Sequence, residues 1–240
     1  MEQTNLENLF IIDIESVSEF EHHEQLTDEW KELWNEKIQR SLPLNCSPAE
    51  YYPMRAGILA EFAKVVCISI GIFNKEKNGL MLRIKSFYSH DERGILDNFI
   101  TMLCDLAKNK NKWYFTGHNI KEFDIPFLCR RMMIKNLPVP ACFDFQSMKP
   151  WETQIIDTLQ LWRFGDYKNY TSLKLLAAAL GVPSPKDDID GSQVGKVYWQ
   201  DKDLERIAVY CQKDVVTVAN VMLRFRNLPL LENDQVITVL

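Results

Sequence analysis

Two acidic side chains close the first apolar run of the chain, FIIDIES, where Asp13 and Glu15 stand two residues apart. Residues two apart in a β-strand share a face, so these carboxylates would lie side by side. Burying them unpaired would be costly, whereas a hard divalent cation such as Mg²⁺ takes oxygen ligands and removes that cost. Taken alone, the pair is also typical of a solvated strand end or of a helix cap.

A second candidate group lies in GHNIKEFDIPFL, where Asp124 is expected at the start of a helix that follows a strand. Asn119 precedes it by five residues. In an α/β sheet this is the crevice at the carboxyl ends of the strands, where ligands usually bind. An aspartate that caps the helix is the alternative for this segment alone.

The third group is YCQKDV, in which Tyr210 and Asp214 are four residues apart. On a helix this spacing places both side chains on one face, where a phenol and a carboxylate can point at the same place. A half-buried tyrosine beside a solvated aspartate would give the same spacing. The order of the three segments, each at an element boundary, favours a shared site.

The elements that position these groups follow from the spacing of apolar residues. Five strands are expected, with the second and third joined as a hairpin by NKEKNG: 9–14, 63–73, 79–88, 113–116 and 155–157. Five helices are expected, the first with one apolar face formed by Leu26, Trp30, Leu33, Trp34 and Ile38: 24–40, 92–108, 123–133, 171–180 and 201–228. Asp91 and Thr171 are the expected caps of the second and fourth helices. Two prolines in 42–53 should break the first helix. No repeat, low-complexity segment or linker interrupts the elements, so the sequence predicts one α/β domain over residues 1–240 with a helical insertion at about 18–54.

Composition narrows the class of protein. Of 240 residues, 46% are hydrophobic and 25% charged, which excludes disordered, collagenous and fibrous chains. Lys and Arg total 28 against 33 Asp and Glu, a net charge of −5, so no generally basic surface is available to bind long nucleic acid through many phosphates. The six cysteines are widely spaced without a CxxC motif, which predicts reduced core residues and neither a zinc site nor a disulfide framework.

The sequence gives no sign of targeting to a membrane. The first ten residues, MEQTNLENLF, lack the basic and apolar regions of a signal peptide, and no apolar run approaches the roughly 20 residues of a membrane span. We therefore expect a cytoplasmic protein without membrane contact.

The three segments together, with their order and spacing, resemble the three exonuclease motifs of the DEDD superfamily of 3′-to-5′ exonucleases. The third segment, YCQKDV, resembles the variant of the third exonuclease motif that contains a tyrosine. Within the superfamily, the chain is similar to the proofreading exonuclease domain of family-B DNA polymerases over about residues 9–227, including the stretch DTLQLWRFGDYKNYTSLKLLAAALGV. Because no polymerase domain follows, it looks like a stand-alone bacterial predicted exonuclease.

This resemblance implies a ribonuclease H-like fold, with a mixed five-stranded sheet flanked by helices. It also implies a metal-dependent 3′-to-5′ exonuclease that releases nucleoside 5′-monophosphates from single-stranded 3′ ends, with DNA preferred. The resemblance assigns two divalent cations, Mg²⁺ or Mn²⁺, to four carboxylates: Asp13, Glu15, Asp124 and Asp214. Tyr210 would orient the attacking water.

The resemblance also suggests substrate contacts for Ile14, Asn119 and Phe123, although core packing or turn capping would explain these residues equally well. Asp157 is expected to cap the next segment or to support a metal or basic group. Aromatic and basic residues alternate between 162 and 170, a pattern that single-strand binding uses, and half of them are expected in the core: Trp162, Arg163, Phe164, Tyr167, Lys168 and Tyr170.

The remaining features have less specific readings. His118 has no ligand role in the family. The insertion helix, with Trp30 and Trp34, would be a packed addition, an overhang of the substrate channel or a dimer contact. Protein partners are not predicted.

Two other functions remain open from the residues. One is an RNA-processing or oligoribonucleotide exonuclease, because residue types alone do not reveal a contact to the 2′-OH. The other is a catalytically inactive nucleic-acid-binding module. The complete set of four carboxylates and Tyr210 argues against the inactive module, which would need none of them.

Overall fold

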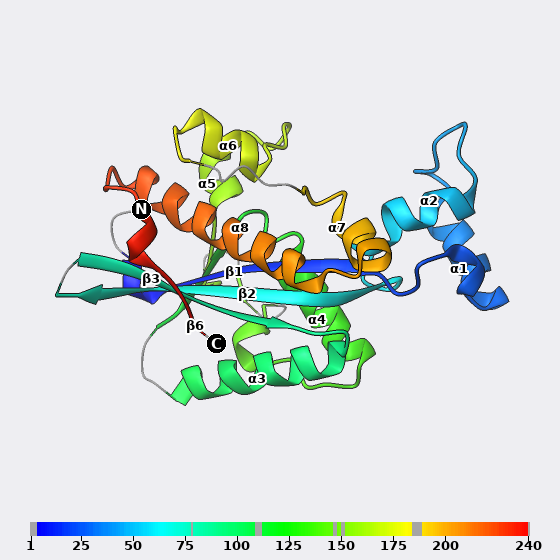
Figure 1. The fold of residues 1–240 in the computed structure, drawn as a ribbon, viewed down its shortest axis with the longest axis horizontal. Coiled ribbons are helices and arrows are strands. Elements are labelled where there is room, and N and C mark those ends of the chain that lie inside the picture. Colours follow the sequence, from blue (N-terminus) through cyan, green and yellow to red (C-terminus); the bar gives the residue numbers. More distant parts are fainter. Residues whose placement is uncertain are drawn as a thin grey trace.

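The computed structural model describes residues 4–77, 79–108, 112–145, 148–149, 152–183 and 189–239. Within these residues the chain forms a mixed α/β fold around one six-stranded sheet, in the order β5-β4-β1-β2-β3-β6 (Figure 1). The strands are β1 (Leu9–Ser18), β2 (Ala63–Glu76), β3 (Gly79–Tyr88), β4 (Tyr114–Gly117), β5 (Ile155–Asp157) and β6 (Val236–Val239).

Strand directions in the sheet are mixed. β1 and β3 both run antiparallel to β2, which confirms the predicted hairpin of β2 and β3. β4 and β5 continue the sheet beyond β1 as parallel strands. The prediction of five strands was wrong by one, because β6 adds to the far edge parallel to β3. The four residues of β6 are mostly exposed, so they lack the buried apolar run that predicted the other strands.

Helices cover both faces of the sheet (Figure 1). The longer ones are α1 (Asp28–Ile38), α2 (Pro48–Arg55), α3 (Glu92–Lys108), α4 (Asp124–Ile134) and α8 (Leu204–Phe225). The shorter ones are α5 (Thr158–Arg163), α6 (Leu173–Ala179) and α7 (Val194–Lys196). α8 lies along one face, and α3 and α4 lie on the other (Figure 1).

The side chains of β1 alternate between these two layers, as the pleat of a strand requires. Phe10, Ile12 and Ile14 are buried against apolar residues of α3 and α4. Leu9 and Ile11 are buried against α8. A central strand with two covered faces explains why β1 reads as a continuous apolar run until the carboxylates.

The insertion differs from the prediction in four ways. β1 extends to Ser18, and α1 is shorter than expected. Trp34 and Ile38 are buried in a small separate core, but Trp30 and Leu33 are 39% and 42% exposed, so the predicted apolar face is only partly covered. The expected break contains α2, because Ser47 and Glu50 form a capping box and Pro48 occupies the first turn, where proline is tolerated.

The end of the chain also departs from the prediction. The long helix α8 begins at Leu204, since Asp203 caps it and a π-helical turn, Val197–Asp201, precedes it. The helix expected at 171–180 is α6, and its cap is Ser172 in place of Thr171. α5 was not predicted as a helix because it is only six residues long.

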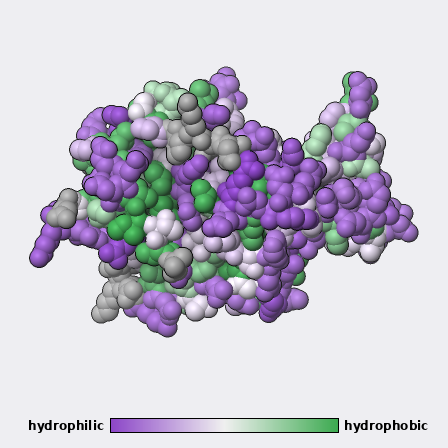
Figure 2. Space-filling model, in the orientation of Figure 1, coloured by the Kyte–Doolittle hydropathy of each residue, from purple (hydrophilic) through white to green (hydrophobic). Residues whose placement is uncertain are grey.

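All six cysteines are free, as predicted. Cys67 and Cys211 are buried, and Cys129 and Cys142 are half-buried against the main core. Cys46 is half-buried and Cys104 is exposed, so the expectation of a core position is wrong for Cys104. Hydrophilic residues cover most of the surface around α1 and α2 (Figure 2). Within the part of the chain that the structure describes, none of the helices has the length and apolar character to cross a bilayer.

Candidate active site

The strand β1 presents two carboxylates to the layer that contains α8. Asp13 and Glu15 lie on the same face of β1 as Leu9 and Ile11, because every second residue of a strand points to the same side. Glu15 is 8% exposed and Asp13 is half-buried. A β-bulge between Glu15 and Ser16 then interrupts the register with β2.

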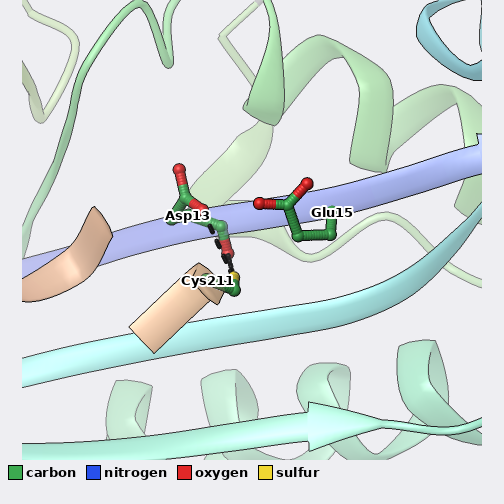
Figure 3. Close-up of side chains that lie close together, drawn as sticks. All are labelled: Asp13, Glu15 and Cys211. Atoms are coloured by element: carbon green, nitrogen blue, oxygen red, sulfur yellow. Dashed lines mark hydrogen bonds between the residues drawn. The ribbon is translucent and has the colours of Figure 1, made fainter. Parts of the chain in front are cut away.

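Helix α8 brings the third sequence segment onto these carboxylates. Asp13 and Glu15 of β1 lie beside Cys211 of α8, and the ligand atoms of the three residues all lie within 4.8 Å of one another (Figure 3). Gly71 of β2 allows this close packing, since a Cβ atom there would lie 2.6 Å from Cγ1 of Val215 on α8. Any larger residue at position 71 would push α8 away from the sheet.

Tyr210 and Asp214 are on the same part of α8, on either side of Cys211 in sequence. The Tyr210 hydroxyl donates a hydrogen bond to the Asp214 carboxylate, as the spacing of four residues allows. Burial raises the pKa of Tyr210 far above its usual value, and the charges of Asp214, Glu15 and Asp13 raise it further. Tyr210 is therefore a protonated hydrogen-bond donor at neutral pH.

Asp124 comes from the opposite side of β1, where it begins α4 and is 4% exposed. Its carboxylate accepts hydrogen bonds from its own backbone N–H and from that of Ile14. Burial, with smaller contributions from Asp157 and Asp214, raises the pKa of Asp124 to about 7 despite these bonds. The second sequence segment is thus attached directly to the strand that carries the first.

Burial also raises the pKa of Asp13 and Glu15 well above the usual range of a carboxyl group. At both residues the charge of Asp214 is the next largest cause, and Asp124 contributes as well. The four carboxylates predicted from three separate segments therefore interact electrostatically in one place. Each of these groups makes ionisation of the others more costly.

Such a set of side chains fits divalent cations. Buried carboxylates that repel one another are stabilised by a bound cation, and hard cations prefer oxygen ligands. The carboxylates of Asp13, Glu15, Asp124 and Asp214 carry oxygens of this kind. The Cys211 thiol, a soft donor, lies on the inner side of this group and donates toward Asp13, so it packs against the site without being needed as a ligand.

Asp157 holds the loop that precedes Asp124. One carboxylate oxygen of Asp157 accepts from the backbone N–H groups of Asn119, Leu159 and Gln160, and the other accepts from Lys121, at 2.9–3.4 Å. This confirms the predicted cap, here of α5. The bonds to residues 119 and 121 were not predicted, because they join segments 36 and 38 residues apart.

The expected substrate contacts lie around Asp124 in different environments. Ile14 is buried in the core on the α4 side, at 5% exposure. Phe123 is half-buried, with its ring centre 5.3 Å from that of Phe127. Asn119 is half-buried and takes a left-handed conformation with φ of 64°, which asparagine tolerates.

The aromatic and basic residues at 162–170 mostly point to solvent. Trp162 packs against the cluster formed by α6 and α8. Phe164, Tyr167 and Tyr170 are 84%, 72% and 63% exposed, so the prediction that half of this set lies in the core is too high. Three exposed rings in one segment are unusual for a surface without a ligand.

Comparison with known proteins identifies the family to which the chain belongs. Residues 58–232 match a family described as predicted 3′-5′ exonucleases related to the exonuclease domain of PolB. The chain belongs to this exonuclease family. A search of curated proteins finds no match. Asp124, Tyr210 and Asp214 lie inside the matched range, whereas Asp13 and Glu15 precede it and are joined to it by the fold.

Among solved structures, this member of the exonuclease family is similar to the family B DNA polymerase of the hyperthermophilic archaeon Pyrobaculum calidifontis. The TM-score is 0.54 at 18% sequence identity, over 90% of this chain and 24% of the polymerase chain. The likeness supports the predicted fold class. The chain spans about a quarter of the length of that polymerase.

Sequence reasoning did not identify Cys211 as part of the site, although it stands inside YCQKDV. Its position next to Tyr210 and three residues before Asp214 was a usable signal, because residues three apart lie near one another on a helix.

Proposed function

We propose that the protein is a metal-dependent 3′-to-5′ exonuclease that hydrolyses single-stranded DNA 3′ ends and releases nucleoside 5′-monophosphates. We further propose that residues 1–240 act as one exonuclease domain with the insertion at 18–54, located in the cytoplasm. The six free cysteines support a reducing compartment.

The observation that supports this function best is the convergence of four acidic side chains from β1, α4 and α8. Burial and mutual repulsion raise the pKa values of Asp13, Glu15 and Asp124, which a structural role would not require. Perturbed carboxylates grouped at a strand end are typical of catalytic sites.

Asp13, Glu15, Asp124 and Asp214 would hold two divalent cations, Mg²⁺ or Mn²⁺. Bound there, the cations would supply charge neutralisation for an in-line displacement at the last phosphodiester. The protein's own contribution is to fix the oxygens that surround the reacting phosphate. The bond from Ile14 N–H to Asp124 and the packing of Cys211 on Asp13 both serve that purpose.

Tyr210 would orient the attacking water. A phenol keeps its proton at neutral pH, and burial raises the pKa of Tyr210 further, so its role here is that of a hydrogen-bonding group. A protonated hydroxyl beside Asp214 can donate to one oxygen and accept from a water molecule at the same time. This arrangement aims the nucleophile without removing its proton.

The substrate class is tested by offering matched single-stranded DNA and RNA oligonucleotides of one sequence, each also annealed to its complement. With Mg²⁺ or Mn²⁺ we expect mononucleotides to be released fastest from single-stranded DNA. Faster release from RNA would assign the enzyme to RNA processing. Binding of either strand without any product, with the metals present, would show an inactive binding module.

A further inference from the structure

The exposed segment between α5 and α6 lies next to the candidate site. Phe164 has a φ of 46° and Gly165 a φ of 91°, both left-handed, so the chain turns sharply where α5 ends. It then leads through Tyr167 and Tyr170 to the cap of α6 at Ser172. This segment is exposed, and few contacts hold it in place.

His118 supplies the main contact. Its Nε2 lies 2.8 Å from the backbone oxygen of Thr171, and its Nδ1 lies 2.9 Å from Thr158 Oγ1. A carbonyl oxygen only accepts, so Nε2 must carry the proton. His118 therefore joins the turn before Asp124 to the segment that carries Tyr170.

Tyr170 rests on that histidine. The centre of its ring is 6.3 Å from that of His118, in an edge-to-face arrangement, while 63% of the residue stays exposed. Asn119, the residue after His118, donates its backbone N–H to Asp157 at 3.0 Å, and Asp124 begins α4 five residues later. The histidine that Tyr170 contacts therefore belongs to the loop that leads to a candidate metal ligand. Burial raises the pKa of Tyr170, and the charges of Asp124 and Asp157 raise it further. An aromatic ring is thus presented to solvent at the edge of the carboxylate group.

We propose that Tyr170 is a substrate-binding residue whose ring stacks on a base at the 3′ end of the strand, and that His118 is a positioning residue that holds Tyr170 there. This proposal rests on the exonuclease function proposed above. In this proposal Tyr170 is the residue of the aromatic segment that contacts the substrate. His118 acts by holding Tyr170 and does not bind a metal.

Stacking accounts for the expected size of the effect. Loss of one aromatic–base contact weakens single-strand binding by roughly 5- to 150-fold. Because stacking is present both before and during cleavage, its loss should raise KM and leave kcat nearly unchanged.

The test compares Tyr170→Leu, Tyr170→Phe and the wild-type enzyme on a 5′-labelled oligo-dT with Mg²⁺. Oligo-dT binding is also measured with Ca²⁺, an oxygen-binding cation, in place of Mg²⁺. Tyr170→Leu should raise both KM and Kd at least about fivefold, whereas Tyr170→Phe, which keeps the ring, should stay near wild type. Tyr88→Leu is the matched control, because this ring is also exposed but lies on β3, outside the aromatic segment.

The role of His118 is tested by a double-mutant cycle. His118→Ala should raise KM as Tyr170→Leu does, and the double variant should be no worse than either single one, since both remove the same contact. Additive losses would overturn the positioning role. Should His118→Ala not fold, His118→Leu, which fills more of the space but has no donor for Thr171, takes its place in the cycle.

An unchanged KM and Kd in Tyr170→Leu would overturn the stacking role. That result differs from a failure of the proposed function, in which the wild-type protein itself would release no nucleotide.

Discussion

The thiol of Cys211 on α8 lies 3.3 Å from Oδ2 of Asp13 on β1 and 3.4 Å from the backbone oxygen of the same residue. This contact sets how closely α8 approaches the strand at the point where the first and third motifs meet. Tyr210 and Asp214 are placed by the same helix, so their distance from Asp13 depends on it. Thiols suit soft metals and carboxylates suit Mg²⁺ or Mn²⁺, so the two residues should differ in function.

Substitution of each partner separates these roles. Asp13→Ala should lower activity by more than the roughly 10- to 100-fold that loss of an outer partner of a metal ligand costs. Cys211→Ala should cost less than about tenfold, because it removes a packing and orienting contact. Cleavage rates with Mg²⁺ and melting temperatures of both variants give the comparison.

The control for this pair is Asp105→Ala, which removes an exposed aspartate that contacts only a lysine on the same helix in the described part of α3. Asp13→Ala should fold and be no less stable than wild type without metal, because the remaining carboxylates repel one another less. Near-normal activity of Asp13→Ala, or complete inactivity of Cys211→Ala, would contradict the carboxylate site.

Tyr210→Phe tests the water-orienting hydroxyl. The ring is kept, so packing should be preserved, while the donor beside Asp214 is lost. Water-positioning groups contribute about 10² to 10⁴ in rate, and we expect the lower end because a phenol that keeps its proton only orients the water. The single-turnover rate measures the effect, with melting temperature and oligonucleotide affinity expected close to wild type.

Tyr198→Phe is the matched control, since its hydroxyl contacts His90 at 2.9 Å, away from the carboxylates. It should lose no activity. An unchanged rate in Tyr210→Phe would assign Tyr210 to packing alone.

The stability of the metal-free protein should fall as pH rises from 6.5 to 8. Folding raises the pKa of Asp124 to about 7, so the folded state binds more protons than the unfolded state up to that pH. The free energy of unfolding then decreases with pH until Asp124 is ionised. The lowered pKa of His118 acts in the opposite direction, and this effect fades as pH rises above its usual value of 6.5, because the unfolded histidine then loses its proton as well.

Melting temperatures in EDTA at the two pH values measure this effect. We expect a drop of several degrees, since about 1 kcal/mol corresponds to roughly 2–4 °C for a chain of this size. Mg²⁺ should restore the melting temperature at pH 8, and Asp124→Asn should reduce the dependence, leaving the part that comes from the raised pKa values of Asp13 and Glu15. Equal melting temperatures at both pH values without metal would show that burial does not raise the pKa of Asp124.

The sequence was sufficient for the strands and helices that carry the site, because each has a long buried face. β1, α4 and α8 all begin and end within four residues of their expected positions. Asp13 and Glu15 could be placed on one face from the period of a strand alone. The order of the three motifs then indicated that the three segments form one site.

Other features depended on contacts between distant residues. The bonds from Asn119 and Lys121 to Asp157 and the contact of His118 with Thr171 join loops that no local pattern connects. β6 and α2 were missed because an exposed edge strand and a helix rich in proline have weak local signals. Exposure at Trp30 and Leu33 depends on which side of α1 meets the rest of the fold, which periodicity does not reveal.

The central claim is metal-dependent removal of nucleotides from the 3′ end. A 5′-labelled single strand should shorten in a ladder from its far end with Mg²⁺ or Mn²⁺, and EDTA should abolish this cleavage until the metal is added back. A matched 3′-labelled strand should release its label as a mononucleotide in the first turnover. Cleavage of a circular single strand, or an undiminished ladder in EDTA, would contradict the claim.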